Sequence, residues 1–544
     1  MKPTLLSSAD IEAYLEAGYW TRDTHAGRLS AYAKEFPDGV ACRDHWETYT
    51  WAELDTATDL LAANLIALGL ARDSCALVRM PSSCREMVLR IALKKAGIIG
   101  AFAPMQWRQR ELEYVREHID PGLLIISKQS FDEDELQWID RTFAMHRIDL
   151  DTPTRDGWLG WTDVANVPPR PDIDQEISAR AFAFDEVSLI TASSGTSGLA
   201  KLCEWPEAAQ ICVGRYIGER MRITEDDTIG IFSPMSGAAG VLVWLVSVTT
   251  PATFVFPASY RAPALLDLVD EVRITVATTV PVILARLAQE PLSDYDLHTL
   301  RALRVGTAAA NTGAARSFED GTGCRVITAA GSMECPGFAH ADFSEDKETR
   351  LSGTIGLRLP GCRSRIVDEN GEDLAVGAVG ELMVTAPYAA SGYWNDLKAT
   401  QAAWRNGWYA TGDMGCLEAD GRLKLIGRLK ETINRSGLKI LPAEVEQEIT
   451  KHPSVFECAV VAAPDPEYGE VPWAFVQPRP GQAVDAEALI DLLRNRGLAH
   501  YKFPTRFITV ESFPRVAGNK VDKKVLLETA HFKTFKNGEI FNAH

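Results

Sequence analysis

Apolar and polar positions follow two alternating patterns along roughly the first two thirds of the chain. Helix-like segments with an apolar face cover 54–69 and 85–97, and short apolar runs suited to strands stand between such segments. Because strands that alternate with helices usually form βαβ units, we predict an α/β fold of parallel sheets covered by helices. The predicted strands are 74–80, 122–128, 273–280 and 302–308.

The pattern changes beyond about residue 350, where the strands become shorter and turns become more frequent. Strands are predicted at 378–384 and 420–428, and Asp420-Gly421 between apolar runs favours a β-hairpin. A small α+β unit is expected to close the chain. Its elements are a helix after Pro442, a strand at 456–463, a helix at 485–494 and a strand at 506–510.

The apolar stretch 238–258 approaches the length of a membrane span. Thr249, Thr250 and Pro251 interrupt it and it lacks basic flanks, so we expect a buried helix, a turn and a buried strand instead. The interval 150–178 is rich in Asp, Pro and Thr, and it is expected to be irregular.

Charge and cysteine content exclude several classes of protein. The 56 basic and 74 acidic residues give a net charge of −18, which argues against general binding to nucleic acids or anionic membranes. The ten cysteines are scattered without a C-x-x-C pair, so they give no zinc or disulfide signature and fit a reducing compartment. The N-terminus has acidic residues where a signal peptide needs an apolar core. We therefore expect a cytoplasmic protein.

The run 191-TASSGTSGLAK-201 follows a predicted strand at 186–192 and carries the chemistry of a phosphate-binding loop. Glycine permits close approach of the backbone, Ser and Thr add short donors, and Lys201 adds positive charge, so a polyphosphate is the natural ligand. The spacing differs from the Walker A motif. A simple Ser/Gly-rich surface loop is the alternative that this run alone leaves open. The loop residues are Ser193, Ser194, Gly195, Thr196, Ser197 and Gly198.

This loop and further motifs in the same order resemble the adenylate-forming superfamily, which includes acyl-CoA synthetases, aryl-acid ligases and luciferases. The resemblance covers nearly the whole chain. It implies that Gly306, Thr307 and Ala308 pack on adenine, and that Glu334 in 330-AGSMECPG-337 serves ATP-bound Mg²⁺, with Ala330, Gly331, Ser332 and Met333 beside the nucleotide. The motifs 409-YATGDMG-415, 427-GRLKETINRSGLKILPAEVE-446 and 518-GNKVDKK-524 complete the set.

The resemblance assigns roles to these last motifs as well. Asp413 is implied to bind the ribose hydroxyls, and Arg428 is implied to bind the ribose and phosphate oxygens. Lys520, Lys201 and Glu334 are the implied catalytic residues. Lys430 is the expected hinge between a large N-terminal domain, 1–428, and a small mobile domain, 429–544. A lysine that contacts both the attacking carboxylate and the α-phosphate would stabilise charge as it develops. ATP and Mg²⁺ are the implied cofactors.

Within the superfamily, the chain looks most like the stand-alone aryl-acid AMP ligases that activate 2,3-dihydroxybenzoate or salicylate. The stretches 18-GYW-20, 119-IDPGLLI-125, 386-APYAASGYWNDLKAT-400, 431-ETINRSGLKI-440 and 501-YKFPTRFITVESFPRVAGNKVDKK-524 carry this likeness. It implies activation of an aromatic acid and transfer to a phosphopantetheine thiol of a carrier protein or CoA. The implied acid pocket contains Ser236, Gly237, Ala238, Gly240, Gly306 and Gly331, and the acceptor side contains Gly437 and Lys439.

Several positions depart from the family pattern and keep alternatives open. Ala238 replaces the asparagine that meets a 2-hydroxyl group, which argues against salicylate-type selectivity. Asn519 and Ser436 replace glycines on the side of the second half-reaction. An amide- or ester-forming ligase with the same acyl adenylate is therefore the first alternative, and a degenerate nucleotide-binding protein is the second. A luciferase-type monooxygenase is a formal possibility on the same fold.

Overall fold

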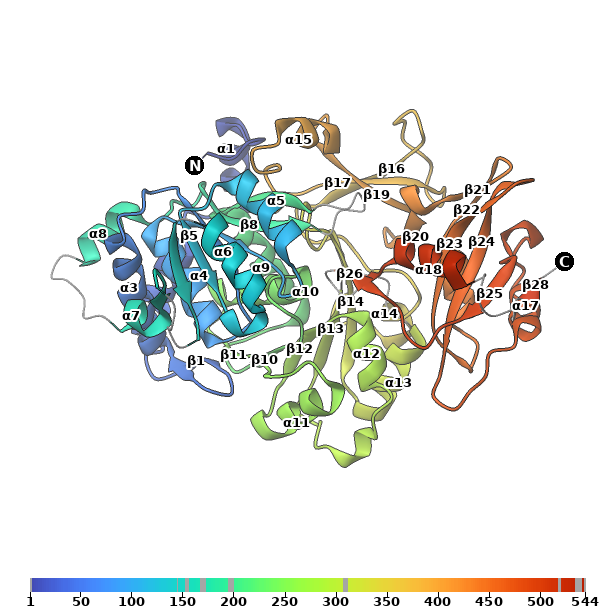
Figure 1. Cartoon of the computed structure of the whole chain (residues 1–544), viewed down its shortest axis with the longest axis horizontal. Helices are drawn as coiled ribbons and strands as arrows, with labels where there is room; N and C mark the ends of the chain where they lie inside the picture. Colours follow the sequence, from blue (N-terminus) through green and yellow to red (C-terminus); the bar gives the residue numbers. More distant parts are fainter. Residues whose placement is uncertain are drawn as a thin grey trace.

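The computed structural model describes residues 2–143, 145–151, 156–166, 173–193, 200–306, 312–516, 520–533 and 541–542. A large N-terminal domain contains helix-covered sheets and a β-rich part, and a smaller domain is formed by the C-terminal end, drawn in orange-red and red in Figure 1. The expected α/β class is confirmed.

The first sheet is built from strands between residues 75 and 206, and the Ser/Gly-rich run connects its last two strands. Its strands are parallel apart from the antiparallel pair β8–β9. Residues of β3 alternate between the two faces, so Leu77 packs with helices α5 and α6 while Val78 packs with α3 and α4. The order is β7 (Leu159–Gly160), β6 (His146–Asp149), β5 (Leu123–Ile126), β3 (Cys75–Arg79), β4 (Ile99–Phe102), β8 (Val187–Ser193) and β9 (Lys201–Pro206). The helices are α3 (Trp51–Ala67), α4 (Cys84–Ala96), α5 (Gln109–Ile119) and α6 (Glu133–Thr142).

The second sheet is parallel at its centre and has an antiparallel strand at each edge. All residues of β12 and β13 are buried, because helices cover both faces. The order is β15 (Ala339–His340), β14 (Arg325–Ala330), β13 (Ala302–Val305), β12 (Val276–Thr279), β10 (Thr228–Ile231), β11 (Thr253–Val255), β1 (Val40–Arg43) and β2 (Thr48–Thr50). The covering helices are α2 (His25–Glu35), α9 (Glu207–Met221), α10 (Ala238–Trp244), α11 (Ala262–Val272), α12 (Pro281–Leu287) and α13 (Thr312–Thr322).

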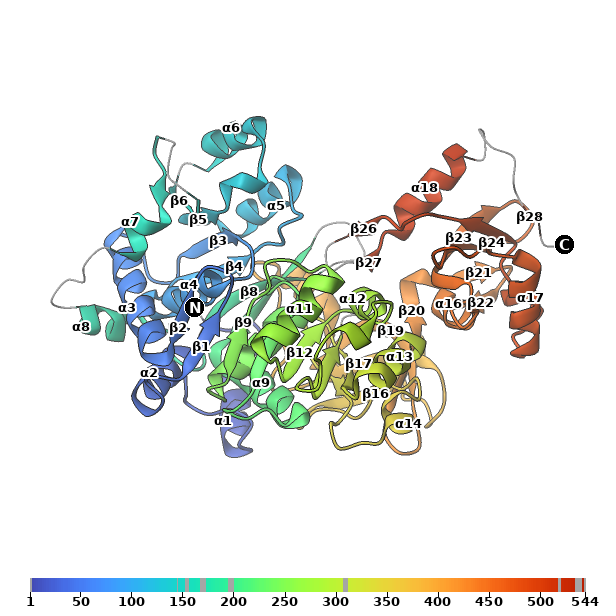
Figure 2. The same ribbon diagram turned by 90° about the horizontal axis from the view of Figure 1, so that it is seen from below.

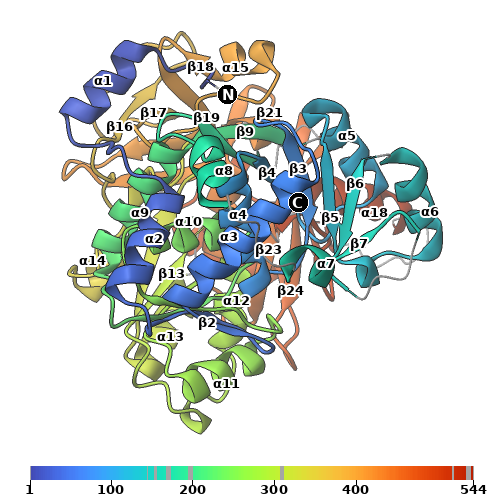
Figure 3. The same cartoon turned by 90° about the vertical axis from the view of Figure 1, so that its left-hand side faces the viewer.

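An antiparallel sheet forms the β-rich part of the large domain. Figure 3 shows helix α1 (Ser8–Glu16) beside this sheet. The nearby Trp20 donates from Nε1 to the carbonyl oxygen of Pro387 at 2.7 Å, which joins two stretches that the family resemblance had singled out separately. The strands are β16 (Arg363–Val367), β17 (Gly380–Thr385), β18 (Trp404–Arg405), β19 (Trp408–Leu417) and β20 (Leu423–Arg428), with α14 (Lys347–Arg350) and α15 (Leu397–Ala403) nearby in the chain.

The small domain contains a mixed sheet with its own apolar core and a separate two-stranded hairpin. Figures 1 and 2 both show the hairpin on the side of the small domain that faces the large one. The sheet contains β21 (Ile433–Arg435), β22 (Leu438–Ile440), β23 (Val455–Asp465), β24 (Gly469–Pro478), β25 (Arg506–Thr509) and β28 (Phe541–Asn542), and the hairpin β26 (Arg515–Val516) and β27 (Lys520–Val521). The helices are α16 (Pro442–Ile449), α17 (Ala486–Asn495) and α18 (Lys523–Lys533).

The predicted strands and hairpin are confirmed, but the expectation of an irregular interval at 150–178 was wrong in part. Strand β7 and helices α7 (Trp161–Ala165) and α8 (Ile173–Arg180) lie partly or wholly in it. Trp161 and Val164 are buried, so tertiary packing overrides the polar composition here. The stretch 238–258 contains helix α10 and strand β11, as expected. Among the described helices, none is long and apolar enough to cross a membrane.

Candidate active site

The Ser/Gly-rich loop connects two antiparallel strands whose ends pair directly. Ser193 at the end of β8 lies opposite Lys201 at the start of β9. Among the described residues, Ser193 Oγ and Thr191 Oγ1 are buried without a hydrogen-bond partner. Such groups are costly to bury, and a polar ligand at this strand end would satisfy them. The predicted loop residues Ser194, Gly195, Thr196, Ser197 and Gly198 lie outside the described residues.

A buried ionic cluster holds β8 in place beneath this loop. Lys94 Nζ donates to Ser188 Oγ of β8 at 2.7 Å and also pairs with Glu207. Glu207 accepts from His25 Nδ1 at 2.7 Å, which joins α2, α4 and α9 to the strand. Burial alone would raise the pKa of Glu207, but His25 and Lys94 outweigh it and hold the pKa well below its ordinary value. The strand that leads to the loop is therefore firmly anchored.

Lys201, Tyr393 and Glu334 form a chain of polar contacts at this strand end. Lys201 Nζ lies 3.5 Å from Tyr393 Oη and 4.6 Å from the centre of its ring. Tyr393 donates from its hydroxyl to Glu334 Oε1 at 2.9 Å. Both Tyr393 and Glu334 are buried, and burial, followed by the charge of Glu334, raises the pKa of Tyr393. Tyr393 therefore remains a hydrogen-bond donor that orients the carboxylate.

Backbone pairing explains how Tyr393 reaches this position. The segment 391–394 runs antiparallel to β9, with Cys203 opposite Tyr393. The backbone N–H of Trp394 donates to the carbonyl oxygen of Leu202 at 2.7 Å. The backbone N–H of Glu204 donates to the carbonyl oxygen of Gly392 at 3.0 Å. A segment distant in sequence thus extends the strand that carries Lys201.

A tight turn after β14 positions Glu334. A Cβ atom at Gly331 would lie 2.3 Å from the backbone nitrogen of Gly337, so only glycine fits this position. Trp205 donates from Nε1 to the carbonyl oxygen of Met333 at 2.9 Å. The backbone N–H of Ala390 donates to the carbonyl oxygen of Glu334 at 2.8 Å. The turn is therefore held from both sides.

Asp413 and Arg428 form a cross-strand pair on β19 and β20. Arg428 Nε lies 2.7 Å from Asp413 Oδ1, and Arg428 Nη1 donates to the carbonyl oxygen of Thr411 at 3.2 Å. The structure thus brings together the two residues that the resemblance assigns to the nucleotide. A carboxylate and a guanidinium in this arrangement can bind a cis-diol and a phosphate oxygen, respectively.

A pocket lies between the start of α10 and the carboxyl ends of β13 and β14. Of the predicted acid-pocket residues, Ala238 and Gly331 line it. A Cβ atom at Gly240 would lie 2.4 Å from the carbonyl oxygen of Ser233, so this glycine allows the helix to pack on the preceding turn. The lining residues are Ala238, Ala239, Leu242, Arg304, Ala329, Ala330, Gly331 and Gly337.

The remaining pocket and adenine-loop candidates are less fully placed. Ser236 and Gly237 immediately precede α10, and Gly306 follows β13. Ser332, next to Gly331, accepts at Oγ from the backbone N–H of Cys335 at 3.2 Å. Thr307 and Ala308 lie outside the described residues.

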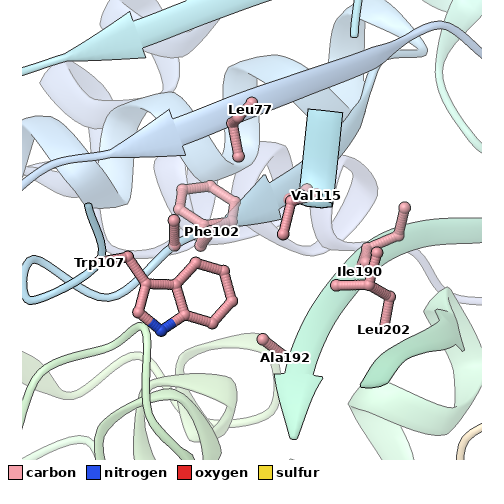
Figure 4. A pocket seen from close by; sticks show the side chains of 9 residues that line it. Leu77, Phe102, Trp107, Val115, Ile190, Ala192 and Leu202 are labelled. Carbon is pink, nitrogen blue, oxygen red and sulfur yellow. The ribbon is translucent and has the colours of Figure 1, made fainter. Parts of the chain in front are cut away.

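A second pocket, shown in Figure 4, is apolar and belongs to the core of the first sheet. Its lining includes Phe102, Trp107 and Leu202, and none of its described lining residues is charged. Without a polar group to orient a substrate, this pocket is a packing feature rather than a site of chemistry.

The candidates in the small domain lie on separate elements. Lys520 begins β27 in the hairpin that faces the large domain, and its side chain lies outside what the structure describes. Lys430 is exposed in the short 3₁₀ turn Leu429–Glu431. The neighbouring Glu431 pairs with Lys523 of α18 at 2.5 Å, which ties this turn to the small domain. Gly437 and Lys439 are exposed on the β21–β22 hairpin.

Sequence reasoning missed two residues of this region. Tyr393 was part of a family-like stretch, but no local pattern connects it with Glu334. Arg304 lies in a predicted strand, and the motifs assign it no role. A charged residue within the otherwise apolar run 302-ALRV-305 was the signal that could have identified it.

Comparison with known proteins shows which family this chain resembles. The model of the AMP-binding enzyme family matches residues 29–394, and that of the AMP-binding enzyme C-terminal domain matches 444–520. The indoleacetate–CoA ligase of Aromatoleum aromaticum is 29% identical over 535 residues, covering 96% of this chain and 99% of that protein. The 2,3-dihydroxybenzoate-AMP ligase of Bacillus subtilis is 28% identical, covering 95% of each.

A crystal structure of the anthranilate CoA ligase AuaEII in complex with anthranoyl-AMP shows the same fold. It aligns with a TM-score of 0.86 at 21% identity, over 94% of this chain and 98% of that one. With the family models covering most of the sequence, the chain belongs to the AMP-binding enzyme family of the adenylate-forming superfamily and is an ATP-dependent, adenylate-forming acid ligase.

Proposed function

We propose that this chain activates an aromatic carboxylic acid with ATP and transfers the acyl group to a phosphopantetheine thiol of a carrier protein or CoA. The observation that carries the proposal is the Lys201–Tyr393–Glu334 chain beside a pocket with small walls. Apart from Leu242 and Arg304, its lining residues are alanines and glycines, whose side chains are small. Relatives of this chain are named for aromatic acids, indoleacetate and 2,3-dihydroxybenzoate.

The nucleotide is expected to bind between the loop after β8 and the β19–β20 pair. Ser193 and the following residues would contact the phosphates, and Asp413 and Arg428 the ribose. Mg²⁺ prefers to be held by one or two carboxylates together with substrate phosphates, and a buried Glu334 fits that donor set. When bound, the ion would neutralise phosphate charge. Glu334 would be the protein ligand, held in place by the hydroxyl of Tyr393.

In the first half-reaction, a carboxylate oxygen attacks the α-phosphorus and the bond to pyrophosphate breaks. Both reactants are anionic, so the site has to reduce their repulsion and hold them in line. Lys201 lies at the base of the phosphate loop. Lys520 is expected to contact the attacking carboxylate and the α-phosphate, where charge develops.

In the second half-reaction, the thiol attacks the acyl carbonyl carbon, loses its proton to solvent, and AMP leaves. The small domain is expected to turn about Lys430, which removes Lys520 and brings the β21–β22 hairpin with Gly437 and Lys439 toward the acyl adenylate. Such alternation is a rigid-body motion about a few residues. The two hairpins lie apart in Figures 1 and 2, so each orientation would present one of them.

Mass spectrometric detection of acyl-AMP tests the first step. Purified protein, ATP and Mg²⁺ would be incubated with benzoates, aminobenzoates, cinnamates, indole carboxylates, fatty acids and amino acids in separate reactions. We expect acyl-AMP and equimolar pyrophosphate with at least one aromatic class. Adenylates formed only from fatty acids or amino acids would contradict the aromatic assignment.

The acceptor is tested on the adenylate that this assay identifies. CoA, a phosphopantetheinylated carrier protein and free amines would be offered separately, and release of AMP would be measured. The proposal predicts a thioester. Turnover with amines alone would instead establish an amide-forming ligase, the alternative that Ser436 keeps open by replacing a glycine at a backbone φ of 47°.

A further inference from the structure

Arg304 occupies an unusual position for a charged residue. It lies in β13, a central strand of the second sheet, and only 3% of its surface is exposed. Its side chain lines the pocket formed by α10 and the ends of β13 and β14, whose other lining residues are apolar or glycine. A guanidinium group in such surroundings needs acceptors for its donors.

Within the part of the chain that the structure describes, the contacts of Arg304 include no counter-ion. Its Nε donates to His340 Nε2 at 3.2 Å, and His340 Nδ1 lies 2.7 Å from the carbonyl oxygen of Ala341. This arrangement requires a neutral imidazole with its hydrogen on Nδ1. Burial, followed by the charge of Arg304, lowers the pKa of His340 to about 3. His340 therefore orients Arg304 without neutralising it.

Two other buried arginines of the large domain differ from Arg304 in this respect. Arg90 pairs with Glu86 at 2.7 Å, and Arg350 pairs with Glu319 at 2.6 Å.

Arg79 is also buried without an ion pair in the described part of the chain, but its Nη1 and Nη2 donate to Ser130 Oγ and to the carbonyl oxygen of Met105. Among the described residues, no carboxylate forms an ion pair with Arg304, and its Nη1 is buried without a hydrogen-bond partner. Since burial lowers the pKa of Arg304 only to about 10, the group keeps its charge at neutral pH.

We propose that Arg304 binds a second carboxylate of the acid substrate, so that the preferred substrates are aromatic dicarboxylic acids. This inference rests on the proposed function, because one carboxylate must react with ATP. The pocket reaches the turn that carries Glu334 through Ala330 and Gly331, so the reacting carboxylate lies at that end and the second one at Arg304.

The chemistry of the pocket favours a carboxylate over a neutral group. A hydroxyl or carbonyl oxygen could accept one hydrogen bond from Arg304 but would leave its charge uncompensated. A carboxylate accepts two parallel hydrogen bonds from a guanidinium fork and supplies the missing negative charge. The second carboxylate takes no part in bond making, and it remains unchanged in the product.

The experiment compares matched substrates in the acyl-AMP assay. The three benzenedicarboxylates and their homologues with one additional methylene would be tested against the corresponding monoamides and monomethyl esters. We expect the KM of the wild-type protein to be at least about tenfold lower for one dicarboxylate than for its monoamide, as loss of one charged hydrogen-bonding partner implies.

Variants then assign the preference to Arg304. Arg304→Met is expected to reduce the KM ratio to near one, and Arg304→Lys to retain part of it. Arg405→Met, at an exposed position, serves as the matched control and should keep the wild-type ratio. Thermal unfolding gives a second readout, because the dicarboxylate should raise the Tm of the wild type but not that of Arg304→Met. If Arg304→Met does not fold, Arg304→Lys is used both for the KM ratio and for the Tm shift, and each should be smaller than in the wild type.

The outcomes separate this inference from the proposed function. Acyl-AMP formation without preference for any dicarboxylate, or a preference that persists in Arg304→Met, would overturn the role of Arg304 and leave adenylation intact. Failure to form acyl-AMP from any carboxylic acid would contradict the proposed function and this inference together.

Discussion

Glu334 and Tyr393 lie 59 residues apart in the sequence, yet their side chains meet at 2.9 Å in the structure. At the residue scale, the sequence pointed to groups that belong to ordered motifs. Lys201, Asp413 and Arg428 lie on paired strands, and Glu334 lies in the turn after β14. The sequence did not identify Tyr393, because that residue is recruited by backbone pairing with β9. Such long-range pairing has no local pattern.

Removal of the Tyr393 hydroxyl should weaken catalysis. Tyr393→Phe takes away the donor to Glu334 Oε1 and the hydroxyl oxygen that Lys201 Nζ contacts at 3.5 Å. A charge-assisted hydrogen bond of about 1.5 kcal/mol corresponds to a loss of about tenfold in the rate of adenylation. Pyrophosphate exchange would measure it. Tyr32→Phe, which removes a buried hydroxyl bonded to the carbonyl of Val248, is the control, and equal rates in the two variants would refute the role of Tyr393.

His340 should make the protein less stable in mild acid. Its pKa is about 3 in the folded state and has an ordinary value of 6.5, so only the unfolded state takes up a proton as pH falls through 6.5. Stability is therefore lost between pH 6.5 and 3, by about 2 kcal/mol at pH 5. Denaturant unfolding at pH 8 and pH 5 should show a smaller difference for His340→Gln. An unchanged difference would contradict this assignment.

At the element scale, strongly periodic segments were predictable and short polar ones were not. Strands β3, β5, β12 and β13 follow from their apolar runs, and helix α17 begins at the side-chain cap of Asp485. Helices α7 and α8 were missed because they are short and lie in an interval rich in Asp, Pro and Thr. Helix α7 is stabilised by burial of Trp161 and Val164, which depends on neighbours elsewhere in the chain.

The turn after β14 should not tolerate a side chain at Gly331. In Gly331→Ala, the added Cβ would lie 2.3 Å from the backbone nitrogen of Gly337, so the turn carrying Glu334 would have to shift. We expect a loss of about 1–3 kcal/mol in unfolding free energy together with a large fall in pyrophosphate exchange. Gly27→Ala is the control, since its nearest contact, Thr24 Oγ1 at 3.3 Å, is a side-chain atom. Full activity of Gly331→Ala would disprove the constraint.

At the scale of the whole molecule, the small domain presents the Lys520 hairpin toward the large domain (Figure 2). The order of motifs predicted the family. It could not predict the unpaired charge of Arg304, which depends on which side chains surround it after folding.

The proposed domain rotation predicts unequal effects on the two half-reactions. Lys430→Pro fixes one backbone angle in the expected hinge, so it should slow acyl transfer by about tenfold or more while adenylation changes little. Single-turnover measurements of each step would show this, and Lys430→Ala, which keeps backbone freedom, should behave like the wild type. Equal losses in both steps for Lys430→Pro would place the hinge elsewhere.

The most direct test of the adenylation mechanism is carboxylate-dependent ATP–pyrophosphate exchange in Lys520→Ala and Lys524→Ala. Both lysines lie in the C-terminal motif, and Lys524 is exposed at the start of α18. We predict that Lys520→Ala loses exchange by about two orders of magnitude or more, while Lys524→Ala retains it. Near-normal exchange in Lys520→Ala would contradict the central claim that this lysine completes the active site.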